Sequence, residues 1–305
     1  MIPVLKQLFI FYIFIVIGWI IGKSKKDAAS KSAVLSVICV NVFLPCKVIQ
    51  NFSTEFTMSY LKNNYVTIII SVSILAILVV LAKIGSRFLT KNPYERKVYD
   101  YSLTITNYAY MGYVLVESLL GVTALTNIIL FCIPFSIYTN TVGYAMLTGN
   151  GKSWKKVLNA PTIAIFVGMF FGLTGIQLPE VITKVINMSS ACMGPVSMLL
   201  VGLVISTFTL RELLPKPRVM IFMLLRLIVL PLAVFGICKG LSLIFTLPPA
   251  VYPSAVIVAA MPCGLNTVVF PRLVGEDCKP GAQLTLYSHL FLCASLPLWL
   301  LILTK

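Results

Sequence analysis

The feature that most constrains the fold is a series of apolar runs, each long enough to cross a bilayer and separated by short loops. A spanning helix needs about 20 consecutive, mainly apolar residues. Because backbone groups in hydrocarbon must satisfy one another, such runs form helices. We therefore expect an all-α polytopic membrane protein with ten transmembrane helices. The expected spans are 4–22, 32–52, 65–86, 98–120, 123–148, 161–178, 181–208, 219–246, 250–274 and 280–303.

Composition excludes an ordinary soluble protein. Charged residues make up 11% of the 305 residues, whereas soluble domains have about 25%. The formal net charge of +15 would indicate nucleic-acid binding in a soluble protein. Here the basic residues lie in loops, so we expect contact with the lipid bilayer and no nucleic acid. The cysteines form no CxxC pair, so we expect neither a disulfide framework nor a metal site.

The loop charges predict how the chain is oriented. Lysines and arginines concentrate in the loops after the first, third, fifth, seventh and ninth spans, including Lys152, Lys155 and Lys156 in the central loop. Loops rich in basic residues face the cytoplasm. We therefore expect a multi-pass plasma-membrane protein with both termini outside.

Landmark residues recur between the two halves at an offset of about 150–160 residues. The matching pairs are Gly18 with Gly175, Pro45 with Pro195, and Asn107 with Asn266. We expect two inverted five-helix repeats, 1–148 and 161–305, joined by a cytoplasmic linker at 149–160. Five spans per half would give the halves opposite orientations, an arrangement typical of secondary transporters. Chance recurrence of common membrane residues is the alternative.

The ninth span contains a helix breaker and a polar amide where an uninterrupted apolar helix would be expected. Pro262 lacks a backbone N–H and clashes with the carbonyl four residues earlier. Gly264, Asn266 and Thr267 follow it. Backbone groups freed at this depth are tolerated where protein or a water-filled cavity satisfies them. The stretch therefore predicts a broken helix beside a binding site.

The fourth span is polar at its centre and supplies the matching feature. It contains Asn107 and, five residues later, Gly112. Two broken helices that cross near the midplane would present half-helix N-termini, which carry partial positive charge and favour a carboxylate. The amides of Asn107 and Asn266 could donate to its oxygens. Hydrogen bonding between helices is the alternative role for either asparagine.

Ionisable residues inside the expected spans are functional candidates by default. Glu117 and Lys47 could pair, or Glu117 could carry a coupling proton. His289 could relay protons or pack as a neutral side chain. Ser197 could line a polar path beside the Pro195 kink. For Arg226, which we place near a span end, we expect its charged head to snorkel into the interface.

At these residues the chain resembles the auxin efflux carrier family, which includes plant PIN-type carriers and bacterial malonate-type transporters. The fourth span resembles the first-half Asn-Gly motif of that family through Asn107, Met111-Gly112 and Leu120-Gly121. The more specific match lies near the carboxyl end. It comprises Ala260-Met261-Pro262-Cys263-Gly264, Val269-Phe270, the Glu276-Asp277 loop, Ser288 and Leu296-Pro297-Leu298.

The resemblance implies a ten-helix fold akin to the bile-acid symporter and sodium/proton antiporter folds. It also implies crossover asparagines that contact a substrate carboxylate, here Asn107 and Asn266. One domain would hold the crossing helices, and the first, second, sixth and seventh spans would form a scaffold.

We therefore expect a secondary carrier of small organic anions, such as mono- or dicarboxylates, working by elevator-like alternating access. We expect no cofactor; a proton or a sodium ion is the candidate coupling ion, and a homodimer is a candidate assembly. The chain has no HExxH motif, no Asp-rich pair and one histidine, so we expect no enzyme. A non-transporting receptor or scaffold that keeps the carrier fold for ligand sensing is the alternative.

Overall fold

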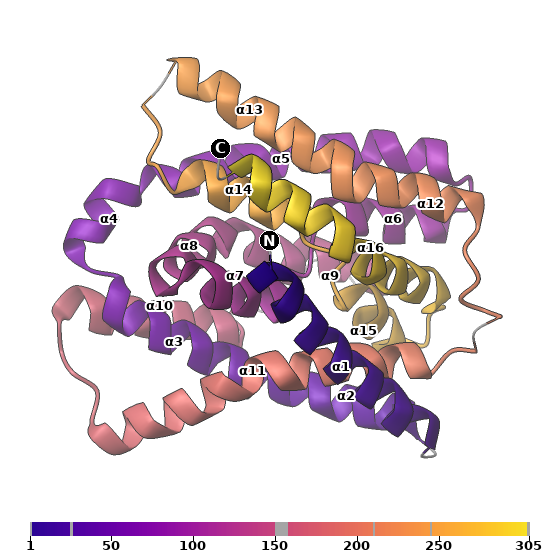
Figure 1. Cartoon of the computed structure of the whole chain (residues 1–305), viewed down its shortest axis with the longest axis horizontal. Helices are drawn as coiled ribbons and strands as arrows, with labels where there is room; N and C mark the ends of the chain where they lie inside the picture. Colours follow the sequence, from indigo (N-terminus) through magenta and orange to yellow (C-terminus); the bar gives the residue numbers. More distant parts are fainter. Residues whose placement is uncertain (1, 25–26, 150–157, 210, 245, 304–305) are drawn as a thin grey trace.

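The computed structural model describes residues 2–24, 27–149, 158–209, 211–244 and 246–303, and within these ranges the chain is helical with no β-strand. Figure 1 shows the arrangement. Seven helices in the described ranges are long and apolar enough to cross a membrane, which confirms a polytopic helical membrane protein. They are Ile2–Ser24, Ala28–Glu55, Val66–Leu89, Val122–Thr148, Glu180–Ser206, Pro217–Ile244 and Lys279–Leu303.

Four of the seven are single helices, and each of the other three contains a five-residue π-helical turn. The single helices are α1 (Ile2–Ser24), α5 (Val66–Leu89), α11 (Glu180–Ser206) and α16 (Lys279–Leu303). The interrupted ones are α2 (Ala28–Ile38), η1 (Cys39–Phe43) and α3 (Leu44–Glu55); α8 (Val122–Tyr138), η3 (Thr139–Gly143) and α9 (Tyr144–Thr148); and α12 (Pro217–Leu224), η5 (Leu225–Val229) and α13 (Leu230–Ile244).

Two of these π turns end two residues before a proline, at Pro45 and Pro231. Proline cannot donate to the carbonyl four residues earlier, so hydrogen bonding must be rearranged locally. For Pro231 the affected carbonyl is that of Leu227, and the indole Nε1 of Trp299 in α16 donates to it at 2.8 Å. The side chain of a neighbouring helix thus satisfies the backbone group, as an apolar surrounding requires.

The other three expected spans contain shorter helices. The fourth consists of α6 (Pro93–Thr104), η2 (Tyr108–Gly112) and α7 (Tyr113–Leu120); the sixth is α10 (Ala160–Thr174); and the ninth consists of α14 (Val251–Ala260) and α15 (Asn266–Leu273). A further short helix, α4 (Met58–Asn64), was not among the expected elements.

The described parts of the central linker are its two ends. Gly149, in left-handed conformation, ends α9, and the side chain of Asn159 caps α10 by accepting from Thr162 N at 3.0 Å. Lys152, Lys155 and Lys156, used to predict orientation, lie outside the described residues.

The helices form two groups (Figure 1). In the first, which we call the scaffold group, α1 packs along α11 and α3 packs along α10. Glycines let the α1 and α11 backbones touch: a Cβ on Gly202 would lie 2.0 Å from the Ile15 carbonyl oxygen, and one on Gly18 would lie 2.2 Å from that of Leu199. In the second group α5 packs against α6 and α13 against α14. The second group thus includes α6 and α14, the first helices of the two broken spans.

Candidate functional site at the crossing of the broken helices

The first break, residues 105–107, separates α6 from η2. Ile105 is extended, with φ −109° and ψ 131°, so the helical hydrogen bonds end with the one from Ile105 N to the Tyr101 carbonyl at 2.7 Å. The chain re-enters a helix through a wide turn in which the Asn107 carbonyl accepts from Met111 N at 3.3 Å and from Gly112 N at 3.0 Å. The spacing of Asn107 and Gly112 noted in the sequence is thus the span of this π turn.

The second break, residues 261–265, separates α14 from α15. Met261 is extended, with φ −66° and ψ 153°, the conformation favoured before a proline. Pro262 has no N–H for the Val258 carbonyl, and Met261 N donates to that oxygen instead at 3.3 Å. Asn266 then begins α15.

The two breaks run antiparallel and contact each other directly. Thr106 and Cys263 form an isolated antiparallel β-bridge, and Asn107 N donates to the Pro262 carbonyl at 2.7 Å. A Cβ on Gly264 would lie 3.2 Å from the Thr106 carbonyl oxygen, so a side chain there would press on the opposite backbone. The two breaks therefore contact each other backbone to backbone, and we call this contact the crossing.

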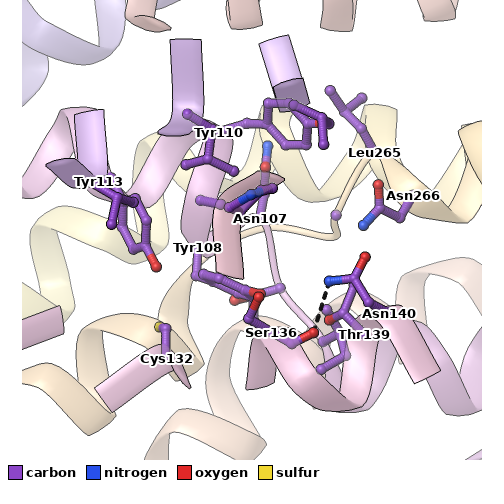
Figure 2. Close-up of a pocket in the computed structure, with 18 of the residues that line it drawn as sticks. Asn107, Tyr108, Tyr110, Tyr113, Cys132, Ser136, Thr139, Asn140, Leu265 and Asn266 are labelled. Carbon is purple, nitrogen blue, oxygen red and sulfur yellow. Dashed lines mark hydrogen bonds between the residues drawn. The ribbon is translucent and has the colours of Figure 1, made fainter. Parts of the chain in front are cut away.

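A cavity of about 90 Å³ lies between the crossing and the α3/α10 pair. Both asparagines line it, and Figure 2 shows Asn266 facing Asn140 at one edge. The first residues of η2 line it too, so the N-terminal ends of η2 and α15, with their partial positive charge, both meet the cavity. No charged side chain is among its lining residues in the described chain. The polar and aromatic lining residues are Thr106, Asn107, Tyr108, Tyr110, Tyr113, Ser136, Thr139, Asn140 and Asn266.

Several buried polar atoms of this lining have no hydrogen-bond partner among the described residues. They include Asn107 Oδ1, Thr106 Oγ1 and Thr139 Oγ1. A buried polar group without a partner costs about 1–3 kcal/mol, and most native side chains avoid that cost. Unpartnered atoms gathered around one cavity are the arrangement expected of a site that binds a polar solute.

The side-chain amide of Asn107 is hydrogen-bonded to His289, the only histidine in the sequence. His289 Nδ1 lies 2.7 Å from the Thr285 carbonyl, which can only accept, so Nδ1 carries the proton. Nε2 is then an acceptor, and Asn107 Nδ2 donates to it at 3.2 Å. Asn107 Oδ1 consequently remains unpartnered. His289 therefore determines which atom of Asn107 is left free.

Four other predicted site residues support the crossing instead of lining the cavity. Gly112 is buried against the Met261 side chain. Pro262 contributes its carbonyl to Asn107. Thr267 donates to the Gly264 carbonyl at 2.7 Å. Ser197 of α11, fully buried, donates to the Tyr110 carbonyl at 2.9 Å. The structure thus places Ser197 on a contact between the scaffold group and η2, which follows the first break.

Lys47 and Glu117 lie away from the crossing and form an ion pair with each other. Glu117 also lines a second, polar cavity of about 390 Å³ between α3, α7 and α11. The pair joins α3 of the scaffold group to α7. Neither residue lines the crossing cavity.

Sequence reasoning missed part of the cavity lining. Ser136, Thr139 and Asn140, at the end of α8 and in η3, all line it. The sequence could have indicated these residues, because they form a polar cluster inside the apolar fifth span, as Thr106 and Asn107 do in the fourth. In the described part of the chain, no three His, Cys, Asp or Glu side chains are grouped so as to hold a metal ion, and all eight cysteines are free.

The expectation for Arg226 is wrong. A snorkelling arginine has an exposed head group, but Arg226 is 0% exposed. Its Nη2 donates to the Met261 carbonyl at 3.1 Å, at the second break. The error came from placing the residue by its distance from the span end, whereas the η5 turn directs it toward α14.

Comparison with known proteins identifies the family. A family model described as "Membrane transport protein" matches residues 3–157 and 150–300, which together cover almost the whole chain. A search of the curated proteins gives no match. The family match agrees with the resemblance found at the two asparagine motifs. The chain therefore belongs to the membrane transport proteins of the auxin efflux carrier family.

Proposed function

We propose that this protein is a secondary transporter of small organic anions, with its substrate site in the crossing cavity. The observation that carries the proposal is the position of Asn107 and Asn266. They come from two broken helices, meet at one cavity and are accompanied there by unpartnered polar atoms. Family membership supports transport as the activity, and the chemistry of the cavity supports the substrate class.

A carboxylate fits the cavity chemically. Asn266 is half-buried, and its amide could donate to one carboxylate oxygen. The N-terminal ends of η2 and α15 favour negative charge. The cavity is small beside the roughly 300–1,000 Å³ of sites for drug-sized ligands. These features favour an acid of a few carbon atoms.

We further propose that the fold consists of two inverted five-helix repeats with ten spans. The pattern of helix packing supports this. The first span (α1) packs on the seventh (α11), and the sixth (α10) packs on the second (α3). In both cases the first span of one half packs against the second span of the other half. The antiparallel contact of the two breaks is also what inverted copies would produce. From the loop charges we propose a plasma-membrane location, with both termini outside.

Alternating access would then move the crossing relative to the scaffold group. The scaffold group is rigid at the α1/α11 contact, where glycines bring the backbones together. The crossing contacts it through polar bonds that such a motion would have to exchange, such as Ser197 Oγ to the Tyr110 carbonyl. Motion of one such group around a site at the repeat interface is how many secondary transporters work.

For the coupling ion, the geometry favours a proton over sodium. Protonation of His289 would turn Nε2 into a donor. Asn107 would then have to present Oδ1 to it, which would leave Nδ2 facing the cavity. Because Nδ2 donates and Oδ1 only accepts, a proton on His289 would improve the site for a carboxylate.

A binding assay with a flux assay tests the proposal. We would measure the melting temperature of the purified protein with acetate, malonate, succinate and citrate, and with the neutral diamide malonamide. At least one acid should stabilise it, and malonamide should not. Asn266→Ala should weaken that binding by about 10- to 100-fold, the range for a hydrogen bond to a charged group. Asn64→Ala, in the short helix α4, is the matched control and should bind normally.

The flux assay separates the proposal from its rival. Uptake of the stabilising acid into proteoliposomes would support a transporter. Binding without uptake would favour a receptor or scaffold that keeps the carrier fold for ligand sensing. Failure of every acid to stabilise the protein and to enter the vesicles would contradict the substrate class.

A further inference from the structure

Arg226 is a buried cation that the crossing cavity does not use directly. It lies in η5, is 0% exposed and makes one hydrogen bond, from Nη2 to the Met261 carbonyl. Its Nε and Nη1 donate to no acceptor among the described residues. The ion pairs found there do not involve it. A charged group inside a membrane span is costly unless it is paired.

Capping of α14 explains only part of this arrangement. Met261 is the C-cap residue of α14, and cations near a helix C-terminus interact favourably with its negative end. One N–H group of Arg226 caps the helix by donating to the Met261 carbonyl. A neutral donor could satisfy the same carbonyl without the cost of burying a charge. The charge itself therefore remains to be explained.

The position of Arg226 connects it to the site through a single residue. Met261 precedes Pro262, whose carbonyl accepts from Asn107 N. The Met261 side chain packs beside Gly112 in the opposite broken helix. Arg226 does not line the cavity, and no other charged side chain does in the described ranges. Arg226 is thus a buried positive charge one hydrogen bond from the second break and outside the lining of a neutral polar cavity.

We propose that Arg226 is a positioning residue whose charge makes the crossing cavity select anions over neutral molecules of similar shape. The inference rests on the proposed function and deepens it. An acid bound in the cavity supplies the negative charge that Arg226 otherwise lacks. At the effective dielectric of about 20 found in proteins, a unit charge about 10 Å away changes anion binding by roughly tenfold.

Two substitutions separate the charge of Arg226 from its hydrogen bond. Arg226→Gln and Arg226→Lys can both donate to the Met261 carbonyl, but only lysine keeps the positive charge. We would measure the KM for uptake into proteoliposomes of whichever acid among acetate, malonate, succinate and citrate the unaltered protein moves fastest. R226Q should raise this KM roughly tenfold and R226K less than threefold. Equal effects of the two variants, or none, would overturn the inference.

A second pair of variants covers the case in which R226Q does not fold. Arg226 is close enough to Cys263 to interact with it electrostatically, so Cys263→Asp would neutralise the arginine without removing it. Its matched control is Cys263→Asn. The aspartate variant should raise KM roughly tenfold above the asparagine variant, and equal KM values would contradict the inference. If the unaltered protein moves none of the four acids, the proposed function fails and this inference fails with it.

Discussion

The two broken spans are built differently although they meet at one cavity. The first break has no proline, and its asparagine is 1% exposed and bonded to His289. The second break contains Pro262 and Gly264, and its asparagine is half-buried at the cavity edge. Asn107 is therefore positioned by a titratable neighbour, whereas Asn266 is available to a ligand. Under the proposed function the two breaks would divide the roles, the first responding to a proton on His289 and the second contacting the substrate first.

The breaks also differ in what supports them. The first is bonded to the scaffold group through Ser197 of α11. The second is bonded to α16 and η5, through Ser288 and Arg226. If the crossing moves against the scaffold group, the first broken span must therefore exchange the Ser197 contact. The second keeps the contacts of its break but must exchange the bond from Arg272 of α15 to Thr207 at the end of α11.

The largest expected effect comes from adding a methyl group at the crossing. Gly264→Ala would place a Cβ 3.2 Å from the Thr106 carbonyl, which is backbone, while Gly112→Ala would meet the flexible Met261 side chain at 3.4 Å. Overpacking costs about 1–3 kcal/mol where neighbours cannot move. We expect G264A to lower flux about tenfold or more, and G112A to change it less than about threefold. Equal losses in proteoliposome uptake would show that the breaks are equally close-packed.

An intermediate effect is expected on the pH dependence of transport. Protonated His289 should favour carboxylate binding through Asn107, but its burial disfavours the charged imidazole. Flux should therefore rise only toward the acid end of the range from pH 7.5 to 5.0. His289→Gln and Asn107→Ala should each remove that rise. Asn266→Ala should lower flux by a similar factor at every pH, because Tyr101, the titratable group that interacts with its side chain, stays neutral throughout this range. Uptake rates at four pH values check this, and a lost pH response in the Asn266 variant would contradict the division of roles.

The smallest effect is expected from the serines that support the breaks. Ser288→Ala leaves Cys263 N, which is buried, without the acceptor it now has at 2.9 Å. Ser197→Ala removes a donor from the Tyr110 carbonyl. Hydrogen bonds between membrane helices contribute about 0.6 kcal/mol on average, so both losses are modest. Melting temperatures should fall more for S288A than for S197A, and the reverse order would show that the scaffold contact is the stronger support.

Sequence alone predicted the second break better than the first. Pro262 and Gly264 act locally on the backbone, so their effect can be read without the fold. The first break depends on tertiary contacts, namely the Pro262 carbonyl that pairs with Asn107 N. Its location was inferred from polar residues and from the match to Asn266. Apolar run lengths likewise predicted the helices but not the π turns within them.

Residues whose role depends on a neighbour in space were the ones missed. Nothing in the local sequence shows that Arg226 reaches Met261, or that Asn140 lies beside Asn266. Both follow from how the eighth and fifth spans pack against the broken helices. The polar cluster in an apolar span could have marked Asn140 as a candidate, whereas the isolated Arg226 gave no signal of its partner.

The central claim is that the crossing cavity binds the transported anion through both asparagines. The most direct measurement is uptake of the stabilising acid into proteoliposomes by the unaltered protein, by Asn107→Ala and by Asn266→Ala, with melting temperatures as a folding control. We predict that both variants fold normally and that each lowers uptake about tenfold or more. Near-normal uptake by both folded variants would contradict the claim.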